Sequence, residues 1–323
     1  MGFEKKKLVL RKGVIKCSNN EILIRQGIRD KKSKIIRDDA KTNIIGRVYA
    51  TFRVPTLVED FLSQLKPEEK KDALDFLQLL YSMGWLVDEN FNTLEEVNSF
   101  LKEIKLGIIY RGSNLKKILD SLGEFNFKEV SLWIEGKTKK DELTINNVRF
   151  FNEELTENSL KKFIDPLDFL VVILDEFSPN LLHSVNEQCL KRPLKWIGCY
   201  FNGSEVVITP LFVPGETVCY NETEIQLESV LSHRTEYFVY KESIKNGNLE
   251  GKDSYILSYN FLIGINLLLN IMINFLLTNK LLLKDRGVVI NFDDLVIDYY
   301  DVLRLPKCPA CNSESCDYTH VFL

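Results

Sequence analysis

The chain has 323 residues, of which 45% are hydrophobic, and its formal net charge is −4. This length can hold two ordinary domains with real cores, and the mild acidity gives no reason to expect general binding to nucleic acid. The chain has seven cysteines, and its N-terminus, MGFEKKK, lacks the apolar core of a secretory signal, which favours a reducing cytoplasm.

The first 90 residues predict a small domain of their own. Short β-rich pieces separated by turn residues occur at residues 8–10, 14–16, 22–24 and 34–37. Three helices are expected next, at residues 43–52, 56–65 and 67–83. Thr56 is a candidate cap for the second helix, Gly84 ends the third, and a closing strand or wing follows at 85–87. This order of elements is typical of a winged-helix domain.

Winged helices often bind DNA, so a DNA-binding regulator is one alternative function. Phosphate binding would require a basic recognition helix. The expected third helix is instead near neutral, with the charged residues Glu68, Glu69, Lys70, Lys71, Asp72 and Asp75. Residues 1–41 hold many Lys and Arg, and such a face is either simply solvated or attracts an acidic peptide.

A linker helix and a second domain are expected after the small domain. Residues 91–104 read as a helix that begins with a capping box, Thr93 and Glu96, and the linker is assigned to residues 91–105. Residues 106–110 and 130–135 predict two strands joined by a helix. The second domain is assigned to residues 106–323 and to the α/β class.

The stretch from residue 167 to 222 carries the clearest pattern in the chain. An apolar run at 167–174 predicts a strand buried on both faces, and a helix to about residue 190 follows, with Ser178 or Asn180 as its cap. A second apolar run at 196–201, the turn Asn202-Gly203 and a strand at 205–208 come next. Strand, helix and strand in this order predict a βαβ unit with parallel strands.

Residues 254–279 contain no charged residue and are long enough to span a bilayer. However, Asn266, Asn270 and Asn274 recur every fourth residue and therefore stack on one face of a helix. A polar stripe favours a helix buried in protein, or packed on a second subunit, over a membrane span. A terminal hairpin is expected at 287–291 and 294–300.

The central stretch closes on PLFVPGETVCYNE, and with its strand–helix–strand order it resembles the ThiF-like (ubiquitin-activating-enzyme-like) fold. It is most similar to the branch that assists YcaO cyclodehydratases in making thiazole/oxazole-modified peptides. The resemblance implies a Rossmann-type α/β scaffold, a homodimer, and a role in the biosynthesis of a bacteriocin of the microcin type or of a thiopeptide. It also implies two partners, which are the leader of a ribosomal precursor peptide and a YcaO-type subunit that this chain activates.

The same resemblance implies where the leader binds. In this family the winged-helix domain captures the leader as an added strand that packs on the third helix, which is β-augmentation. The expected edge consists of Ser33, Lys34, Ile35, Ile36 and Arg37. The expected facing surface of the third helix consists of Lys71, Asp75, Gln78, Leu79 and Ser82.

The nucleotide site of active ThiF-like enzymes is expected to be degenerate here. Those enzymes have a turn resembling G-x-G-x-x-G after the first strand, which closes around ATP phosphates. Here the turn is YRGSN, and only Gly112 remains. Asp175, at the end of the central strand, is either a remnant ATP or Mg²⁺ residue or a turn acid. No ATP is expected on this chain, and a divergent adenylating enzyme is the alternative.

A structural zinc site is the remaining chemical candidate. Cys308 and Cys311 form C-P-x-C, a common half of a zinc site. The resemblance supplies the other half as C-Y-x-C, in which Cys219 matches but Glu222 replaces the second cysteine. Either Glu222 ligates through oxygen, or the fourth sulfur comes from Cys316, or the metal is lost. A local site made of Cys308, Cys311, Cys316 and His320 is a further alternative. No catalytic residues are expected, because the histidines show no Ser-His-Asp or Cys-His spacing.

Overall fold

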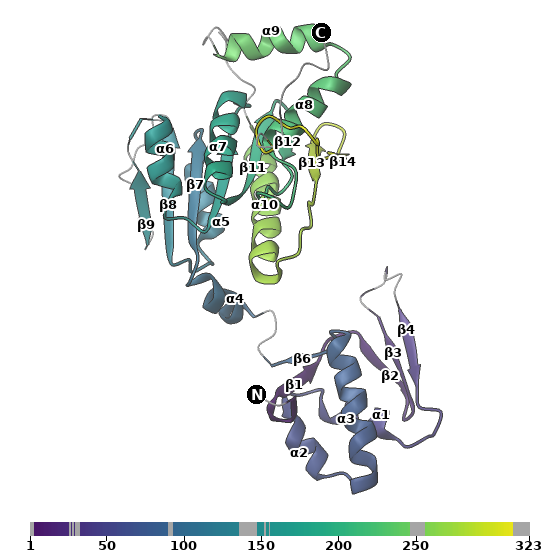
Figure 1. Cartoon of the computed structure of the whole chain (residues 1–323). Helices are drawn as coiled ribbons and strands as arrows, with labels where there is room; N and C mark the ends of the chain where they lie inside the picture. Colours follow the sequence, from purple (N-terminus) through teal and green to yellow (C-terminus); the bar gives the residue numbers. More distant parts are fainter. Residues whose placement is uncertain are drawn as a thin grey trace. The chain divides into compact units, whose positions relative to one another are not determined.

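A computed structural model describes residues 3–25, 27, 29, 33–89, 93–135, 147–151, 153–154, 156–245 and 256–312. The chain divides into two compact units, Met1–Glu96 and Val97–Leu323 (Figure 1). Each unit has its own hydrophobic core, one in the N-terminal unit and two on the opposite faces of a sheet in the second unit. His320 and Cys316 lie outside the described residues.

The N-terminal unit contains two small sheets and three helices. Its strands are β1 (Lys7–Leu10), β2 (Val14–Ser18), β3 (Glu21–Ile24), β4 (Lys34–Arg37), β5 (Thr56–Leu57) and β6 (Leu86–Asp88). Its helices are α1 (Ile44–Thr51), α2 (Val58–Ser63), α3 (Pro67–Ser82) and the short 3-10 turn η1 (Phe3–Lys5). The sheets have the orders β5-β1-β6 and β2-β3-β4. The four β-rich pieces of the first 37 residues therefore do not share one sheet, because β1 pairs with the later strands β5 and β6.

The start of the second helix differs from the sequence-based expectation. Thr56 was expected to cap a helix over residues 56–65, but Thr56 and Leu57 form β5 and pair with Leu8 and Lys7. The helix α2 begins only at Val58. The long-range pairing with β1 satisfies the backbone of residues 56–57, so this segment does not need to join the helix.

The second unit is built on a mixed sheet of eight strands. Its strands are β7 (Lys105–Arg111), β8 (Glu129–Glu135), β9 (Val148–Phe151), β10 (Phe169–Leu174), β11 (Lys195–Asn202), β12 (Glu205–Ile208), β13 (Arg286–Asn291) and β14 (Val296–Asp301). The order is β14-β13-β12-β11-β10-β7-β8-β9. Strands β7 to β11 are parallel, and β12, β13 and β14 add on antiparallel. The expected βαβ unit and the terminal hairpin are both present.

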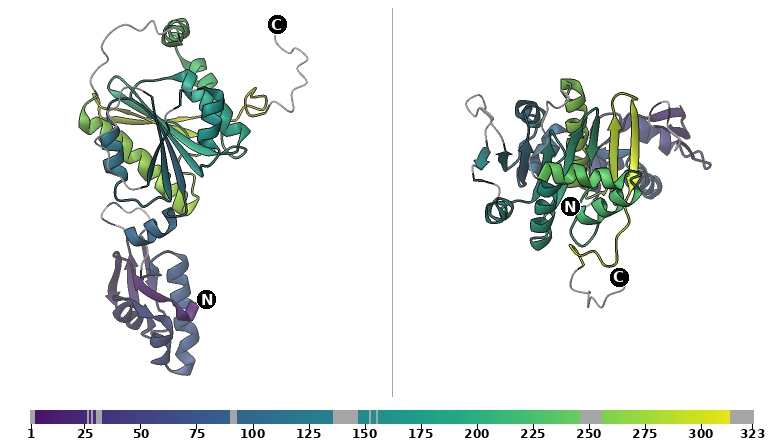
Figure 2. Two further views of the ribbon diagram at one scale, coloured as in Figure 1. Left: turned by 90° about the vertical axis from the view of Figure 1, so that its left-hand side faces the viewer. Right: turned by 90° about the horizontal axis from the view of Figure 1, so that it is seen from above.

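Helices cover both faces of this sheet, as the two views show (Figure 1, Figure 2). The helices that follow β6 in the chain are α4 (Leu94–Leu101), α5 (Leu115–Leu122), α6 (Glu157–Ile164), α7 (Pro179–Lys191), α8 (Tyr220–Val230), α9 (Arg234–Lys245) and α10 (Ser258–Thr278). One face packs on α5 and α10, and the other packs on α6 and α7. Every residue of β10 is buried, which explains why its sequence is an unbroken apolar run.

Helix α10 is long and apolar enough to cross a membrane by composition, and half of its most apolar window is buried inside the unit. Gly264 brings it close to the sheet, since a β-carbon there would lie 2.9 Å from Cγ2 of Val206. The asparagine stripe was expected on a helix buried in protein or packed on a second subunit, and Asn266, Asn270 and Asn274 are exposed within this chain. The apolar side of the helix packs on the sheet, so the polar side is the one left outside.

Candidate functional site

The carboxyl ends of β7 and β10 form the place where an open α/β sheet usually binds a ligand. These two strands lie side by side, while β8 lies on the other side of β7, so the chain order reverses between β7 and β10. Such a switch point leaves a crevice beyond the strand ends. Gly112 follows β7 and Asp175 follows β10, and the two loops meet there.

The carboxylate of Asp175 lies at this switch point and accepts several hydrogen bonds from the loop that follows β7. Oδ2 accepts the backbone N–H of Ser113 at 2.8 Å, and Oδ1 accepts the hydroxyl of Tyr110 at 3.0 Å. The side-chain amide of Asn114 also donates to Oδ2, at 3.3 Å. Asp175 is therefore more than an acid at the start of a turn, because it organises the loop that follows β7.

Tyr110, on β7, also takes part in this hydrogen-bond network. Its hydroxyl accepts the backbone N–H of Asn114 while donating to Asp175. Burial and the neighbouring Asp175 carboxylate raise the pKa of Tyr110, so the phenol stays protonated and keeps donating. The two backbone N–H groups of Ser113 and Asn114, which would be the phosphate donors of a glycine-rich loop, are both engaged by side chains of this chain.

A second cluster lies at the N-terminus of α8. Cys219, Glu222, Cys308 and Cys311 place their sulfur and oxygen atoms within 4.8 Å of one another. The sulfurs of Cys219 and Cys308 are 3.7 Å apart. Two thiolates on one tetrahedral zinc ion are about 3.8 Å apart, given a zinc–sulfur distance of about 2.3 Å. The donor set can therefore hold a metal ion, and the geometry of the two sulfurs fits zinc.

The thiols of this cluster differ in acidity. Burial raises the pKa of Cys219 to about 12 and also raises that of Cys311. Burial would raise the pKa of Cys308 too, but hydrogen bonds from the backbone of Cys311 and Ala310 and from the side chain of Asn221 lower it. Cys308 is accordingly the thiol that ionises most readily, as the first ligand of a soft cation would need to.

Glu222 also joins α8 to the C-terminal segment. Its Oε2 accepts the N–H of Cys219 at 2.8 Å, and its Oε1 accepts the N–H of Leu305 at 2.7 Å. Next to it, the side chain of Gln226 exchanges two hydrogen bonds with the backbone of Leu303. The structure thus brings Cys219, Glu222, Cys308 and Cys311 together, while Cys316 falls outside the described residues.

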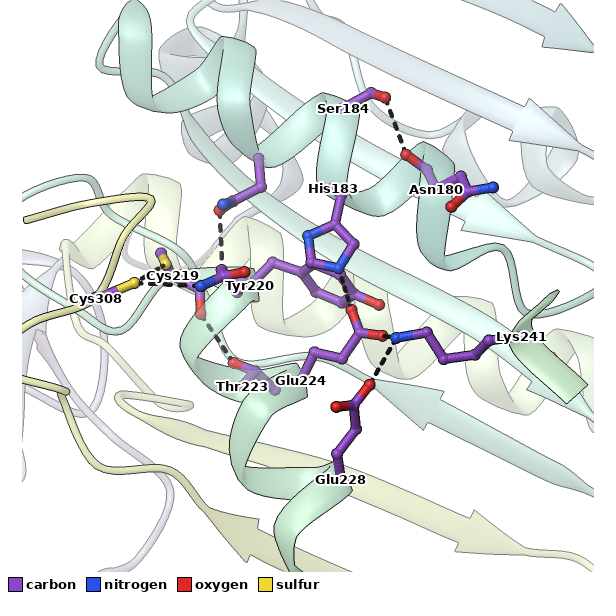
Figure 3. A network of polar contacts seen from close by, with 12 residues as sticks. Asn180, His183, Ser184, Cys219, Tyr220, Thr223, Glu224, Glu228, Lys241 and Cys308 are labelled. Carbon is purple, nitrogen blue, oxygen red and sulfur yellow. Dashed lines mark hydrogen bonds and ion pairs between the residues drawn. The ribbon is translucent and has the colours of Figure 1, made fainter. Parts of the chain in front are cut away.

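A partly buried ionic network, which the sequence-based reasoning did not find, connects three helices (Figure 3). The two carboxylate oxygens of Glu224 contact Nε2 of His183, on α7, and Nζ of Lys241, on α9. Lys241 also contacts Glu228, one turn along α8, at 2.6 Å. The four-residue spacing of Glu224 and Glu228 was the available signal. This network attaches α9 beyond the carboxyl ends of the parallel strands (Figure 1).

The expected peptide-binding residues occupy the N-terminal unit as follows. Strand β4 is an edge strand of the β2-β3-β4 sheet, and Ile36 packs against the core while Lys34, Ile35 and Arg37 are exposed. Ser33, which precedes β4, is exposed as well. On α3 the expected residues Lys71, Asp75, Gln78, Leu79 and Ser82 are all exposed, opposite the buried Ala73, Leu77 and Leu80. Nothing in the structure assigns a ligand to them, and their role stays a prediction.

No protein-family model and no curated protein matches the chain. Solved structures do match it over nearly its whole length. MccB of E. coli, in a complex with MccA-N7isoASN, matches with a TM-score of 0.66 and 18% identity, over 95% of this chain and 99% of that chain.

The chain has the fold of MccB. The resemblance to the ThiF-like fold that PLFVPGETVCYNE indicates is confirmed at the level of the fold. A heterocyclase in complex with substrate and cofactor matches with a TM-score of 0.67 and 14% identity, over 96% of this chain and 40% of that chain. The heterocyclase TruD matches with a TM-score of 0.64 and 14% identity, over 96% of this chain and 43% of that chain. MccB has also been crystallised with ATP.

Proposed function

We propose that this chain is a non-catalytic adaptor of peptide modification. In this proposal its N-terminal unit, a winged-helix-type recognition domain, binds the leader of a ribosomal precursor peptide. Its second unit, a Rossmann-type scaffold, presents that peptide to a separate YcaO-type cyclodehydratase and activates it. Support comes from the shared fold with MccB, seen with an MccA peptide, and with a heterocyclase seen with its substrate.

The observation that carries the proposal is the Asp175 carboxylate at the switch point of the sheet. It accepts the N–H of Ser113, and Tyr110 takes the N–H of Asn114. A phosphate brought to this loop would lose both backbone donors and would face a carboxylate of its own sign. The backbone N–H groups of this loop are therefore already hydrogen-bonded within the chain. This supports the proposal that ATP binds to the partner subunit and not to this chain.

The edge strand β4 supports peptide binding. It has no further strand on its outer side among the described residues, so its outward backbone groups can pair with an added strand.

The experiment is fluorescence polarisation of the full-length chain with a labelled leader from a precursor peptide encoded beside it. We expect a dissociation constant of about 1 μM or tighter. Failure of every neighbouring leader to bind would overturn the adaptor function.

A second candidate function is ATP-dependent adenylation, favoured by the near-complete coverage of MccB, which has been crystallised with ATP. The two candidates separate in one measurement. An adaptor that does not bind ATP shows no change in melting temperature with Mg-ATP. A chain that binds ATP is stabilised by about 2.7 kcal/mol when the free ATP concentration is 100 times the dissociation constant. Release of pyrophosphate from ATP that depends on added peptide and requires no protein besides this chain would establish adenylation.

Zinc at the cluster of Cys219, Glu222, Cys308 and Cys311 is part of the proposal, as a structural ion. These four residues would hold it, and its chemistry would be to crosslink α8 to the C-terminal segment. Glu222 already makes part of that connection through Leu305. The arrangement offers no water-activating site, because all four groups are protein ligands.

We also propose a homodimer. The outer face of α10 exposes Tyr259 and Ile263 in line with the asparagine stripe. Apolar side chains set among amides that can donate and accept suit a contact between two copies of the same helix.

A further inference from the structure

The β2-β3-β4 sheet has an apolar row on the face that points away from the core. Ile15 of β2 pairs with Leu23 of β3, and Leu23 pairs with Ile35 of β4. Residues paired across strands point to the same face. Ile15 and Ile35 are 47% and 53% exposed. This row crosses the whole sheet and ends at β4.

The opposite face of the same sheet is the core face. Ile22 and Ile24 are buried there, and Ile36, which pairs with Ile22, packs against the core. Consecutive residues of a strand point to opposite faces. Strand β4 therefore offers an isoleucine to each face, Ile35 outward and Ile36 inward.

Basic residues flank these two isoleucines. Lys34 precedes them and Arg37 follows them, and both are exposed. Arg37 already contacts Glu21 at 3.2 Å, but two thirds of its side chain is exposed. Among residues 1–41 there are thirteen Lys and Arg against five Asp and Glu, so this part of the sequence is basic as a whole.

We propose that β4 selects a peptide strand with the pattern acidic, apolar, apolar, acidic. This inference rests on the proposed function and names the substrate class for the same site. An added strand would set one apolar side chain beside Ile35, extending the outer row, and the next beside Ile36, at the margin of the core. Its acidic residues would lie opposite Lys34 and Arg37. The pattern reads the same in both directions, so it holds for parallel and antiparallel addition.

The same charges select against a second copy of this chain. Edge-to-edge pairing of two β4 strands would place Lys34 and Arg37 opposite basic residues, and like charges directly opposite each other destabilise a strand pair. Charged residues on an edge strand commonly prevent such self-pairing. An acidic strand meets no such penalty, which is why the occupant is a peptide of opposite charge.

The test uses the full-length chain and labelled synthetic peptides with the cores Glu-Ile-Val-Glu, Lys-Ile-Val-Lys and Glu-Ser-Ser-Glu. We expect the first to bind about tenfold more tightly than each of the others, since opposite-charge and apolar pairs each contribute up to about a factor of five. The double variant Lys34→Glu with Arg37→Glu should reverse the preference between the two charged peptides.

The control is Lys16→Glu, which makes on β2, at the other edge of the same sheet, the same substitution as Lys34→Glu. It should leave the preference unchanged. No preference among the peptides, or a reversal by Lys16→Glu instead, would overturn the inference, as would self-association of the wild-type chain that Ile35→Glu abolishes. A genuine leader that binds equally to wild type and to the double variant would overturn this inference while leaving the proposed function standing.

Discussion

The carboxylate of Asp175 lies against the backbone of Gly112. A β-carbon added to this glycine would stand 2.1 Å from Cγ of Asp175 and 2.3 Å from its Oδ2. Only a residue without a side chain fits at this point. Gly112, the one glycine of the YRGSN turn, therefore makes room here for an acidic side chain of the same chain.

Replacement of Asp175 by Ala is expected to lower the free energy of unfolding by about 1–3 kcal/mol, because Ser113 N–H and Tyr110 Oη lose their acceptor. Denaturant titration of the full-length chain measures it. The control is Asp298→Ala, at an exposed position on β14, which should change stability by less than about 0.5 kcal/mol. Equal effects of the two substitutions would contradict a structural role for Asp175.

The metal content of the purified chain should be about one zinc ion per chain, measured by elemental analysis. Cys308→Ser should lose the metal, because Cys308 is the most acidic thiol of the cluster. Glu222→Cys should retain zinc at chelator concentrations that strip the wild type, since thiolate is the softer ligand. Cys17→Ser, at an exposed cysteine of β2, is the control. Retention of zinc in Cys308→Ser would exclude this site.

Attachment of α9 should be sensitive to acid. Burial raises the pKa of Glu224, but His183 and Lys241 together bring it below its ordinary value of 4.5. Its contribution is therefore fully present above pH 4.5 and is lost as the pH falls through the lowered value. Hydrogen exchange of α9 should accelerate over that interval before the rest of the unit unfolds.

Lys241→Met should accelerate exchange in α9 already at neutral pH, since it leaves the buried Glu224 with His183 alone. Glu236→Gln, at an exposed position on the same helix, provides the comparison. Should both variants exchange like the wild type, the ionic network would not be what holds α9.

The proposed homodimer makes a prediction for Ile263, which is half exposed on α10. Ile263→Lys places charges in a contact between two copies and should convert the dimer to a monomer in sedimentation velocity. Leu295→Lys, at a position that is 83% exposed in the β13–β14 turn, should leave the dimer intact. A wild-type chain that sediments as a monomer would remove the proposal.

The sequence by itself determined those elements whose cause is local. An unbroken apolar run marked β10 as buried on both faces. Ser178, one of the two expected caps, and Asn202-Gly203 marked where α7 begins and where the chain turns back into β12. The pair Cys308 and Cys311 indicated a half-site for a metal in the same way. In each case the pattern and the structure that it specifies lie within a few residues of each other.

Only the tertiary structure decided which distant residues meet. Asp175 reaches the loop after β7 because β10 pairs with β7 rather than with β8, and Cys219 meets Cys308 across 89 positions of the chain. The polar side of α10 faces outward. Strand β1 pairs with β5 and β6, and not with β2, which follows it in the sequence. Strand order and helix orientation follow from burying apolar surface over the whole domain, and no local period in the sequence specifies them.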